Sequence, residues 1–228
     1  MVIGNGLLAK AFDSYENNDK VLIFASGVSN STETNLEEFE REFKLLSSAI
    51  VNNPRCTIVY FSTVSIGDAS VNERPYVLHK IALENYIKMT AKKYLICRIS
   101  NVVGAKGNAN TIMNYLVDAI KQNIKFDIWI LAERNLIDVN DVKFIIDELL
   151  YKNIVSKTIN IATSKSVLVL DIVSRIEIYL KQKANTNLML KGNELSIDVS
   201  DISDELKKTE SKRGKGIDYI DSLLNKYY

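Results

Sequence analysis

The chain has 228 residues, of which 46% are apolar and 25% charged, with a formal net charge of +1. This length suits one domain, or one sheet domain with a smaller lobe, that needs no disulfide or metal to fold. The balanced charge gives no reason to expect a nucleic-acid or membrane-surface partner. No apolar run approaches the ~20 residues that a membrane-spanning helix needs. One histidine, His79, and two cysteines exclude a Cys/His zinc site.

The cysteines and the first residues bear on location. Cys56 and Cys97 each lie in an apolar run that predicts a strand. Buried free thiols fit a reducing compartment. The first twelve residues have too short an apolar stretch for a signal peptide and no basic leader. We therefore expect a cytoplasmic protein.

Short apolar runs alternate with longer amphipathic ones along most of the chain. The predicted strands are Val2–Ile3, Val21–Ala25, Cys56–Phe61, Tyr94–Ile99, Ile124–Leu131, Thr158–Ile161 and Leu195–Val199. The predicted helices are Leu7–Tyr15, 35–51, 76–93, 111–122, Val139–Tyr151, Ser166–Lys183 and 217–227, and a loop covers Gly104–Asn110. Trp129 lies inside a predicted strand and is expected in the core, whereas His79 is expected on an exposed helix face.

This alternation, with strands that are apolar throughout, is typical of a parallel sheet covered by helices on both faces. We therefore predict an α/β fold of the Rossmann type. Ligands of such sheets bind beyond the carboxyl ends of the strands. Four loops leave predicted strands there and should meet around one cleft: Gly4–Gly6, Ser26–Asn30, Ser62–Asp68 and Asn101–Gly107.

A glycine pattern, Gly4-x-Gly6-x-x-Ala9, follows the first strand and opens a helix. Glycine lets the backbone approach a pyrophosphate, which the N–H groups at the helix start can bind. The small Ala9 allows close packing of helix on strand. A tight strand–helix turn without a ligand would have the same pattern, so other residues must decide.

A tyrosine and a lysine lie one helical turn apart at Tyr76 and Lys80. A nearby ammonium favours the phenolate and lowers a tyrosine pKa from ~10 toward the working range. Such a phenol can exchange a proton with a carbonyl or carbinol oxygen.

The same spacing recurs at Tyr179 and Lys183, which we interpret as a solvated helix surface. Only the first pair has a third partner. The strand before its helix ends in Ser62-Thr63, whose hydroxyl can bind the same substrate oxygen. We therefore favour the first pair as the reactive one.

Several segments, in this order, resemble those of the extended short-chain dehydrogenase/reductases, in the NAD-dependent epimerase/dehydratase branch that acts on nucleotide sugars. The matching segments are VLIFASGVSNS, IVYFST, RPYVLHKIALE, CRISNVVGAKG, RNLIDVNDV and NIATSKSVLVLDIVSRI. The resemblance covers nearly the whole chain. It implies a single shortened domain, with a nucleotide-binding core over about 1–105 and a substrate lobe mostly within 106–228, from which parts return to the core.

The resemblance also implies which residues form the site. The catalytic residues would be Tyr76, Lys80, Thr63 and Ser62. NAD or NADP would lie against Gly4, Asn5, Gly6, Leu7, Leu8, Ala25, Ser26, Gly27 and Lys80, with no metal. The nucleotide sugar would contact Asn101, Arg134 and Ser65. Family members usually dimerise through the helices that match 35–51 and 76–93, so we expect a homodimer in which Phe43, Leu46, Ile81, Leu83 and Ile87 are available to the partner.

The chain departs from the family pattern in two places. Only Tyr15 to Lys20 separate the glycine helix from Val21–Ala25, where the family inserts a strand–helix–strand unit that holds the adenosine ribose. The choice between NAD and NADP therefore stays open. Val64-Ser65 stands where 4,6-dehydratases carry Asp-Glu, which argues against dehydration.

We expect an NAD(P)-dependent ketoreductase or epimerase for nucleotide-linked keto-sugars in polysaccharide precursor synthesis. The alternative is a non-catalytic relative that has lost tight cofactor binding and serves as a scaffold, a sensor or a partner subunit.

Overall fold

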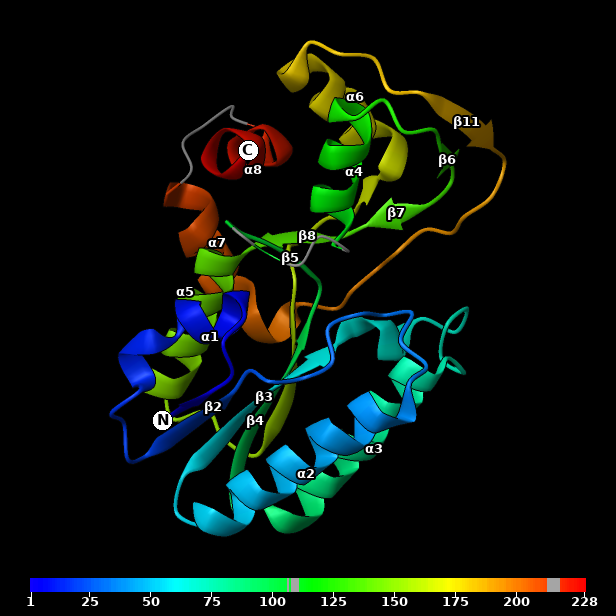
Figure 1. The fold of residues 1–228 in the computed structure, drawn as a ribbon. Coiled ribbons are helices and arrows are strands. Elements are labelled where there is room, and N and C mark those ends of the chain that lie inside the picture. Colours follow the sequence, from blue (N-terminus) through cyan, green and yellow to red (C-terminus); the bar gives the residue numbers. More distant parts are fainter. Residues whose placement is uncertain (106, 108–110, 213–217) are drawn as a thin grey trace.

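The computed structural model describes residues 1–105, 107, 111–212 and 218–228 of the protein. Its centre is a parallel sheet of five strands (Figure 1). In spatial order the strands are β1 (Val2–Ile3), β2 (Val21–Phe24), β3 (Thr57–Thr63), β4 (Lys93–Ile99) and β9 (Lys157–Ile161). The predicted Rossmann-type parallel sheet is confirmed.

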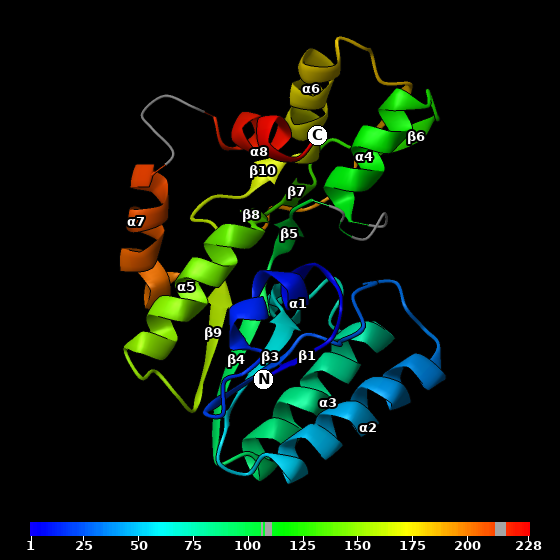
Figure 2. The same cartoon turned by 60° about the vertical axis from the view of Figure 1, so that its left-hand side comes forward.

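Helices cover both faces of this sheet (Figure 2). The first face packs on α2 (Leu36–Asn52) and α3 (Pro75–Thr90), and the second on α1 (Leu7–Ala11), α5 (Val139–Tyr151) and α7 (Ser203–Lys212). All seven residues of β3 are buried because its side chains point alternately to the two faces. Tyr60 thus packs with α2 and α3, and Phe61 with Phe12 after α1.

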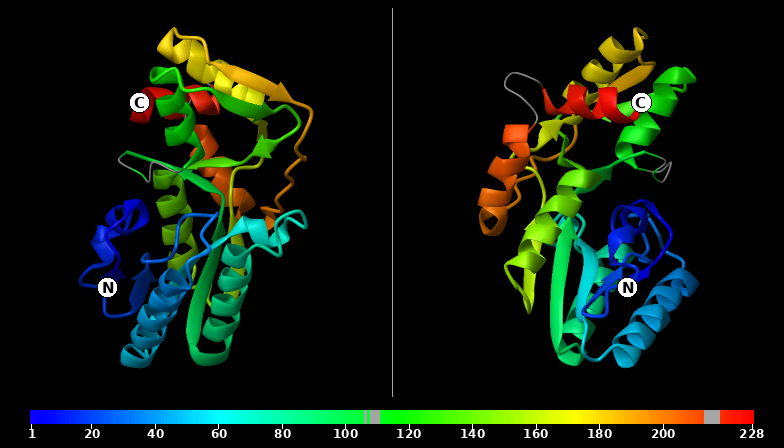
Figure 3. Two further views of the ribbon diagram at one scale, coloured as in Figure 1. Left: turned by 45° about the vertical axis from the view of Figure 1, so that its right-hand side comes forward. Right: turned by 90° about the vertical axis from the view of Figure 1, so that its left-hand side faces the viewer.

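The remaining elements form a second group beyond the carboxyl ends of the strands (Figure 3). Its helices are α4 (Ile112–Lys121), α6 (Val169–Leu180) and α8 (Tyr219–Tyr227), which share one apolar core. Three two-stranded sheets accompany them: β6 (Phe126–Trp129) with β11 (Thr186–Met189), β7 (Glu133–Arg134) with β10 (Val167–Leu168), and β5 (Asn101–Val103) with β8 (Leu136–Asp138).

Two predicted elements differ from the structure, and one helix was not predicted. The first helix ends at Ala11, and a 3₁₀ turn follows at Asp13–Tyr15. Leu195–Val199 forms no strand, and the strand of this region is β11 instead. Helix α7 was not predicted, because Ser203–Lys212 is too polar for an apolar stripe to stand out. In two predicted segments, residues 106, 108–110 and 217 lie outside the described part.

The sheet is short on the side of β1. This strand pairs directly with β2, with Val2 opposite Ile23 and Ile3 opposite Phe24, and forms the edge of the sheet. Only a few residues separate the glycine helix from Val21. Among the described residues, no further strand lies beyond β1. Over that same part of the chain, no helix is long and apolar enough to cross a membrane.

Candidate active site

A cleft of about 1270 Å³ lies between the carboxyl ends of the sheet and the second group of elements. From the sheet side, all four predicted loops contribute residues to its lining. The opposite wall comes from Trp129, Ala132, Glu133 and Arg134, together with 192–195. Every residue predicted for catalysis, cofactor binding or substrate binding lines this one cleft.

The glycine turn that follows β1 is shaped by Gly4. Its φ is +131°, and a Cβ there would lie 2.3 Å from the carbonyl oxygen of Ala25, so only glycine fits. This requirement comes from the packing of two strands and would hold without any ligand. A Cβ on Gly6, in contrast, would meet nothing within 4 Å. The open space at Gly6 is room that a dinucleotide could fill, so the turn fits the family's cofactor.

Tyr76 and Thr63 both reach the cleft. Tyr76 is the second residue of α3, a helix that begins with Pro75 at its first position, and its side chain is mostly buried. Thr63 is the last residue of β3, and its Oγ1 accepts a hydrogen bond from the N–H of Ser65 at 3.2 Å. We find no hydrogen bond between the Tyr76 hydroxyl and the residues that the structure describes. That hydroxyl is thus available for a ligand.

Lys80 lies beside Tyr76 but is paired with another residue. Its Nζ is 5.7 Å from the centre of the Tyr76 ring and donates to Oε1 of Glu42 at 2.9 Å and to the Tyr60 hydroxyl at 3.2 Å. Only 2% of Lys80 is exposed. The ammonium therefore belongs to a buried ion pair, which the sequence analysis did not predict.

Glu42, on α2, is fully buried at the centre of this cluster. Besides Lys80, its carboxylate accepts hydrogen bonds from the Val28 N–H at 2.7 Å and the Tyr60 hydroxyl at 2.8 Å. Burial by itself would raise the pKa of Glu42, but the charge of Lys80 and the hydrogen bonds outweigh it and lower this pKa to about 2. Burial and the Glu42 charge together raise the pKa of the Tyr60 phenol.

His79 also belongs to the Glu42 cluster. Its Nε2 lies 3.1 Å from Oε2 of Glu42, and its ring stacks on Phe39 with centroids 4.5 Å apart. With only 10% of its side chain exposed, the expectation of an exposed histidine is wrong. The buried carboxylate, which the sequence analysis missed, is the reason the ring turns inward.

Ser62 has a structural partner on α3, one helical turn beyond Lys80. Its Oγ donates to Glu84 at 2.7 Å, and Arg98 donates to both oxygens of the same carboxylate at 2.8 Å. Glu84 is only 2% exposed. Burial would raise its pKa, but the bonds from Arg98 and Ser62 lower it overall. Of the two hydroxyls at this strand end, Thr63 is thus the one without a carboxylate partner.

Arg134 lines the opposite wall of the cleft. Its guanidinium donates to the Glu133 carbonyl at 2.7 Å and forms no ion pair within the described part of the chain. Burial lowers the Arg134 pKa, the charge of Asp68 opposes this, and the like charge of Arg74 adds to it. Asn101, in contrast, uses its side-chain amide to donate to the Asn135 carbonyl at 2.9 Å. Arg134 is therefore suited to an anionic ligand, with Arg74 as a second positive charge in the cleft lining.

Trp129 lies on the cleft with 46% of its surface exposed, so its expected place in the core is wrong. Along β6, Phe126 and Ile128 are buried while Asp127 and Trp129 face outward. One face of β6 packs on the apolar core of the second group of elements, and the other face is exposed. The indole is thereby placed where a ligand can change its fluorescence.

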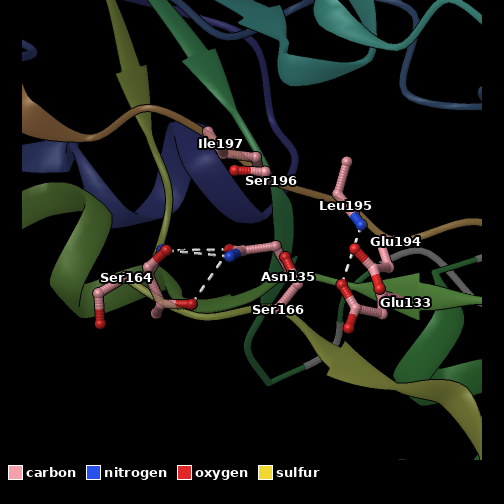
Figure 4. A pocket seen from close by; sticks show the side chains of 9 residues that line it. Glu133, Asn135, Ser164, Ser166, Glu194, Leu195, Ser196 and Ile197 are labelled. Atoms are coloured by element: carbon pink, nitrogen blue, oxygen red, sulfur yellow. Dashed lines mark hydrogen bonds between the residues drawn. The ribbon is translucent and has the colours of Figure 1, made fainter.

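A smaller cavity of about 150 Å³ is lined by Glu133, Asn135 and residues 194–197, among others (Figure 4). At its centre Asn135 donates to the Thr163 carbonyl at 3.0 Å and accepts from the Thr163 N–H at 3.1 Å. Nearby, Glu133 accepts the Leu195 N–H at 2.9 Å. The Asn135 bonds hold the chain after β7 to the residues after β9, and the Leu195 bond holds the segment around 195, which lines the cleft, to β7.

A parallel sheet with a glycine turn, a threonine at a strand end and a tyrosine–lysine pair around one cleft defines a Rossmann-type α/β protein. The chain belongs to the NAD-dependent epimerase/dehydratase family, whose model matches residues 5–162. No curated protein matches the chain.

Solved structures share the fold at low sequence identity. UDP-glucuronic acid 4-epimerase from Bacillus cereus, in complex with UDP-glucuronic acid and NAD, is 18% identical with a TM-score of 0.72, over 96% of this chain and 76% of that one. dTDP-glucose 4,6-dehydratase from Bacillus anthracis, in complex with NAD, is 14% identical with a TM-score of 0.69, over 98% of this chain and 77% of that one. UDP-glucose 4-epimerase from Thermus thermophilus, also in complex with NAD, is 12% identical with a TM-score of 0.66, over 96% of this chain and 80% of that one.

Proposed function

We propose that the protein is an NAD(P)-dependent ketoreductase or epimerase that acts on a nucleotide-linked keto-sugar. The observation that carries this proposal is that Tyr76, Thr63, the Gly4–Gly6 turn and Arg134 all open onto one cleft. A cleft of about 1270 Å³ has room for more than one ligand of ordinary size, since such ligands occupy pockets of roughly 300–1,000 Å³.

Each cleft residue has a proposed part in the reaction. Tyr76 exchanges a proton with the sugar oxygen, which Thr63 orients through its hydroxyl. Arg134 binds the substrate diphosphate, because it carries a charge without a carboxylate partner among the described residues. The substrate also contacts Asn101 and Ser65. When bound, the dinucleotide supplies or accepts the hydride.

The cofactor is proposed to lie along the glycine turn and the loop after β2. Its pyrophosphate would contact Gly4–Leu8, and its other end would lie near Ala25–Gly27 and Lys80. The family membership and the NAD complexes of the three neighbours favour NAD. Because β1 is the sheet edge, no neighbouring strand among the described residues holds the adenosine ribose, and NADP stays open.

One observation favours a second candidate function. The ammonium of Lys80 is paired with Glu42, and Lys80 lines the cleft with only 2% of its surface exposed. A protein whose lysine stayed in this pair would bind a nucleotide or a sugar nucleotide without turnover. It would then act as a scaffold, a sensor or a partner subunit.

Titration with NADH and NADPH tests cofactor binding. Because Trp129 is the sole tryptophan and lies on the cleft, saturable binding in the micromolar range should change its emission. The ligand should also stabilise the fold, by about 2.7 kcal/mol at 100 times its dissociation constant. Emission and thermal unfolding are followed in parallel, with AMP as the control. No change at millimolar dinucleotide would contradict the enzymatic proposal and favour the second candidate.

We also propose a homodimer through α2 and α3, with a set of side chains that only partly matches the predicted one. Leu46, Leu83 and Ile87 are buried in the protein's own core and cannot meet a partner. The exposed apolar side chains of these helices include Leu36, Phe43, Leu78 and Met89. Light scattering at high protein concentration should give twice the chain mass, and a monomer would contradict the dimer. A cytoplasmic location stays a prediction.

A further inference from the structure

The position of the Lys80 ammonium is fixed by more than one contact. Besides the Glu42 carboxylate and the Tyr60 hydroxyl, it lies against the backbone at Gly27. A Cβ on Gly27 would be 2.8 Å from Nζ of Lys80 and 2.8 Å from Oε1 of Glu42. Gly27 thus covers the ion pair on the side of the loop after β2, which lines the cleft. Only a residue without a side chain can lie this close to the ion pair.

Glu42 gathers partners from three neighbouring elements. The Val28 N–H comes from the loop after β2, the Tyr60 hydroxyl from β3, and His79 and Lys80 from α3. A buried carboxylate and ammonium are strongly favoured to stay together once both are hydrogen-bonded. The cluster therefore stabilises one position of the lysine, beneath the loop.

A cofactor contact by Lys80 needs a different position. An ammonium that is 2% exposed and donates to Glu42 and Tyr60 offers almost no surface to a ribose in the cleft. The side chain must first leave the carboxylate. The population that can bind the dinucleotide tightly is then only the fraction in which the pair is open.

We infer that Glu42 is a positioning residue that holds Lys80 beneath Gly27, and that Lys80 serves the dinucleotide only when this ion pair opens. The inference rests on the proposed function, in which Lys80 contacts the cofactor. Glu42 controls how much of the protein is ready for the reaction, although it touches neither cofactor nor substrate.

The test replaces Glu42 by Gln. Glu42→Gln keeps the shape of the side chain but removes the charge that holds the ammonium. An ammonium left buried without a counter-ion loses its proton or moves toward solvent. Lys80 lines the cleft, so the cleft is the route to solvent. Acetylation of Lys80 by an amine-reactive reagent, followed by peptide mass spectrometry, should become at least about tenfold faster, and NADH affinity measured on Trp129 should rise about tenfold.

Glu40→Gln is the matched control. Glu40 lies two residues earlier on α2, is 66% exposed and pairs with Lys44 on the surface. It should change neither the labelling of Lys80 nor the affinity. Lys183, whose side chain is 90% exposed and pairs with Glu177, gives the labelling rate of an exposed lysine in every sample.

The outcomes separate this inference from the proposed function. Labelling of Lys80 in Glu42→Gln at the wild-type rate would overturn the inference, even if the wild type turns over a sugar nucleotide. Faster labelling without NADH binding by either protein would instead contradict the proposed function and leave the hold of Glu42 on Lys80 standing. Should Glu42→Gln not fold, Glu42→Asp retains the charge and withdraws it by one methylene. Labelling should then rise several-fold, and no rise would overturn the inference.

Discussion

Replacing Tyr76 by Phe is expected to lower kcat by about 100- to 10,000-fold, the contribution of a positioned acid–base group. The variant should fold normally, because the lost hydroxyl has no hydrogen bond to the described residues and the ring keeps its place on α3. Turnover is measured from NAD(P)H absorbance with a panel of UDP- and dTDP-linked sugars. Thermal unfolding is recorded on the same samples.

Tyr179→Phe is the matched control for this experiment. Tyr179 precedes Lys183 at the same spacing but lies on α6, outside the cleft lining. Its replacement should leave kcat unchanged. An active Tyr76→Phe variant would remove the proposed acid–base role, whatever the cofactor proves to be.

A second expected result concerns stability in acid. The folded state lowers the pKa of Glu42 from 4.5 to about 2, so the folded protein binds its proton more weakly than the unfolded chain. The resulting stability is present above pH 4.5 and is lost as the pH falls from there to about 2. The loss amounts to about 3 kcal/mol for a shift of this size.

Urea unfolding at successive pH values between 6 and 2 measures this loss. Glu42→Gln should have a shallower decline than the wild type, because a group that does not titrate contributes no pH dependence. Glu40→Gln should follow the wild-type curve, since Glu40 lies on the surface. Equal declines in wild type and Glu42→Gln would show that folding does not lower the pKa of Glu42.

The strands of the parallel sheet and the cleft could be predicted because they depend on local patterns. Apolar runs such as Thr57–Thr63 identify buried parallel strands, and parallel strands bring their following loops to one edge. Tyr76, Thr63 and Arg134 were found in this way, together with the family motifs around them. The parts of the cleft that are formed by the loops after the strands can thus be predicted without knowledge of long-range contacts.

Glu42 was missed, although the sequence contains a signal for it. It stands three residues after Phe39 and four before Leu46, within the apolar stripe of α2. An acidic residue on that face needs a buried partner. Which partner it has could not be predicted, because Lys80 lies 38 residues away and reaches Glu42 only after two helices pack on one face of the sheet.

Trp129 was misplaced for a related reason. The alternation of Phe126, Asp127, Ile128 and Trp129 already puts the indole on the same side as a charged residue. The expected core position followed from its apolar character and not from this alternation. Leu195–Val199 has a strand-like composition, but the segment is held by side-chain bonds such as that from Leu195 to Glu133, with no strand pairing.

The shortened sheet has a consequence for handling the protein in solution. Unpaired strand edges invite edge-to-edge aggregation, and long, flat ones most of all. Here one edge is β1, which is only two residues long. Along the other, β9, the Asn160 side chain donates to the Asp198 carbonyl at 2.9 Å and the turn at Ser200–Ile202 packs nearby. Neither edge offers a long template to a second chain, so concentrated samples should resist this route to precipitation.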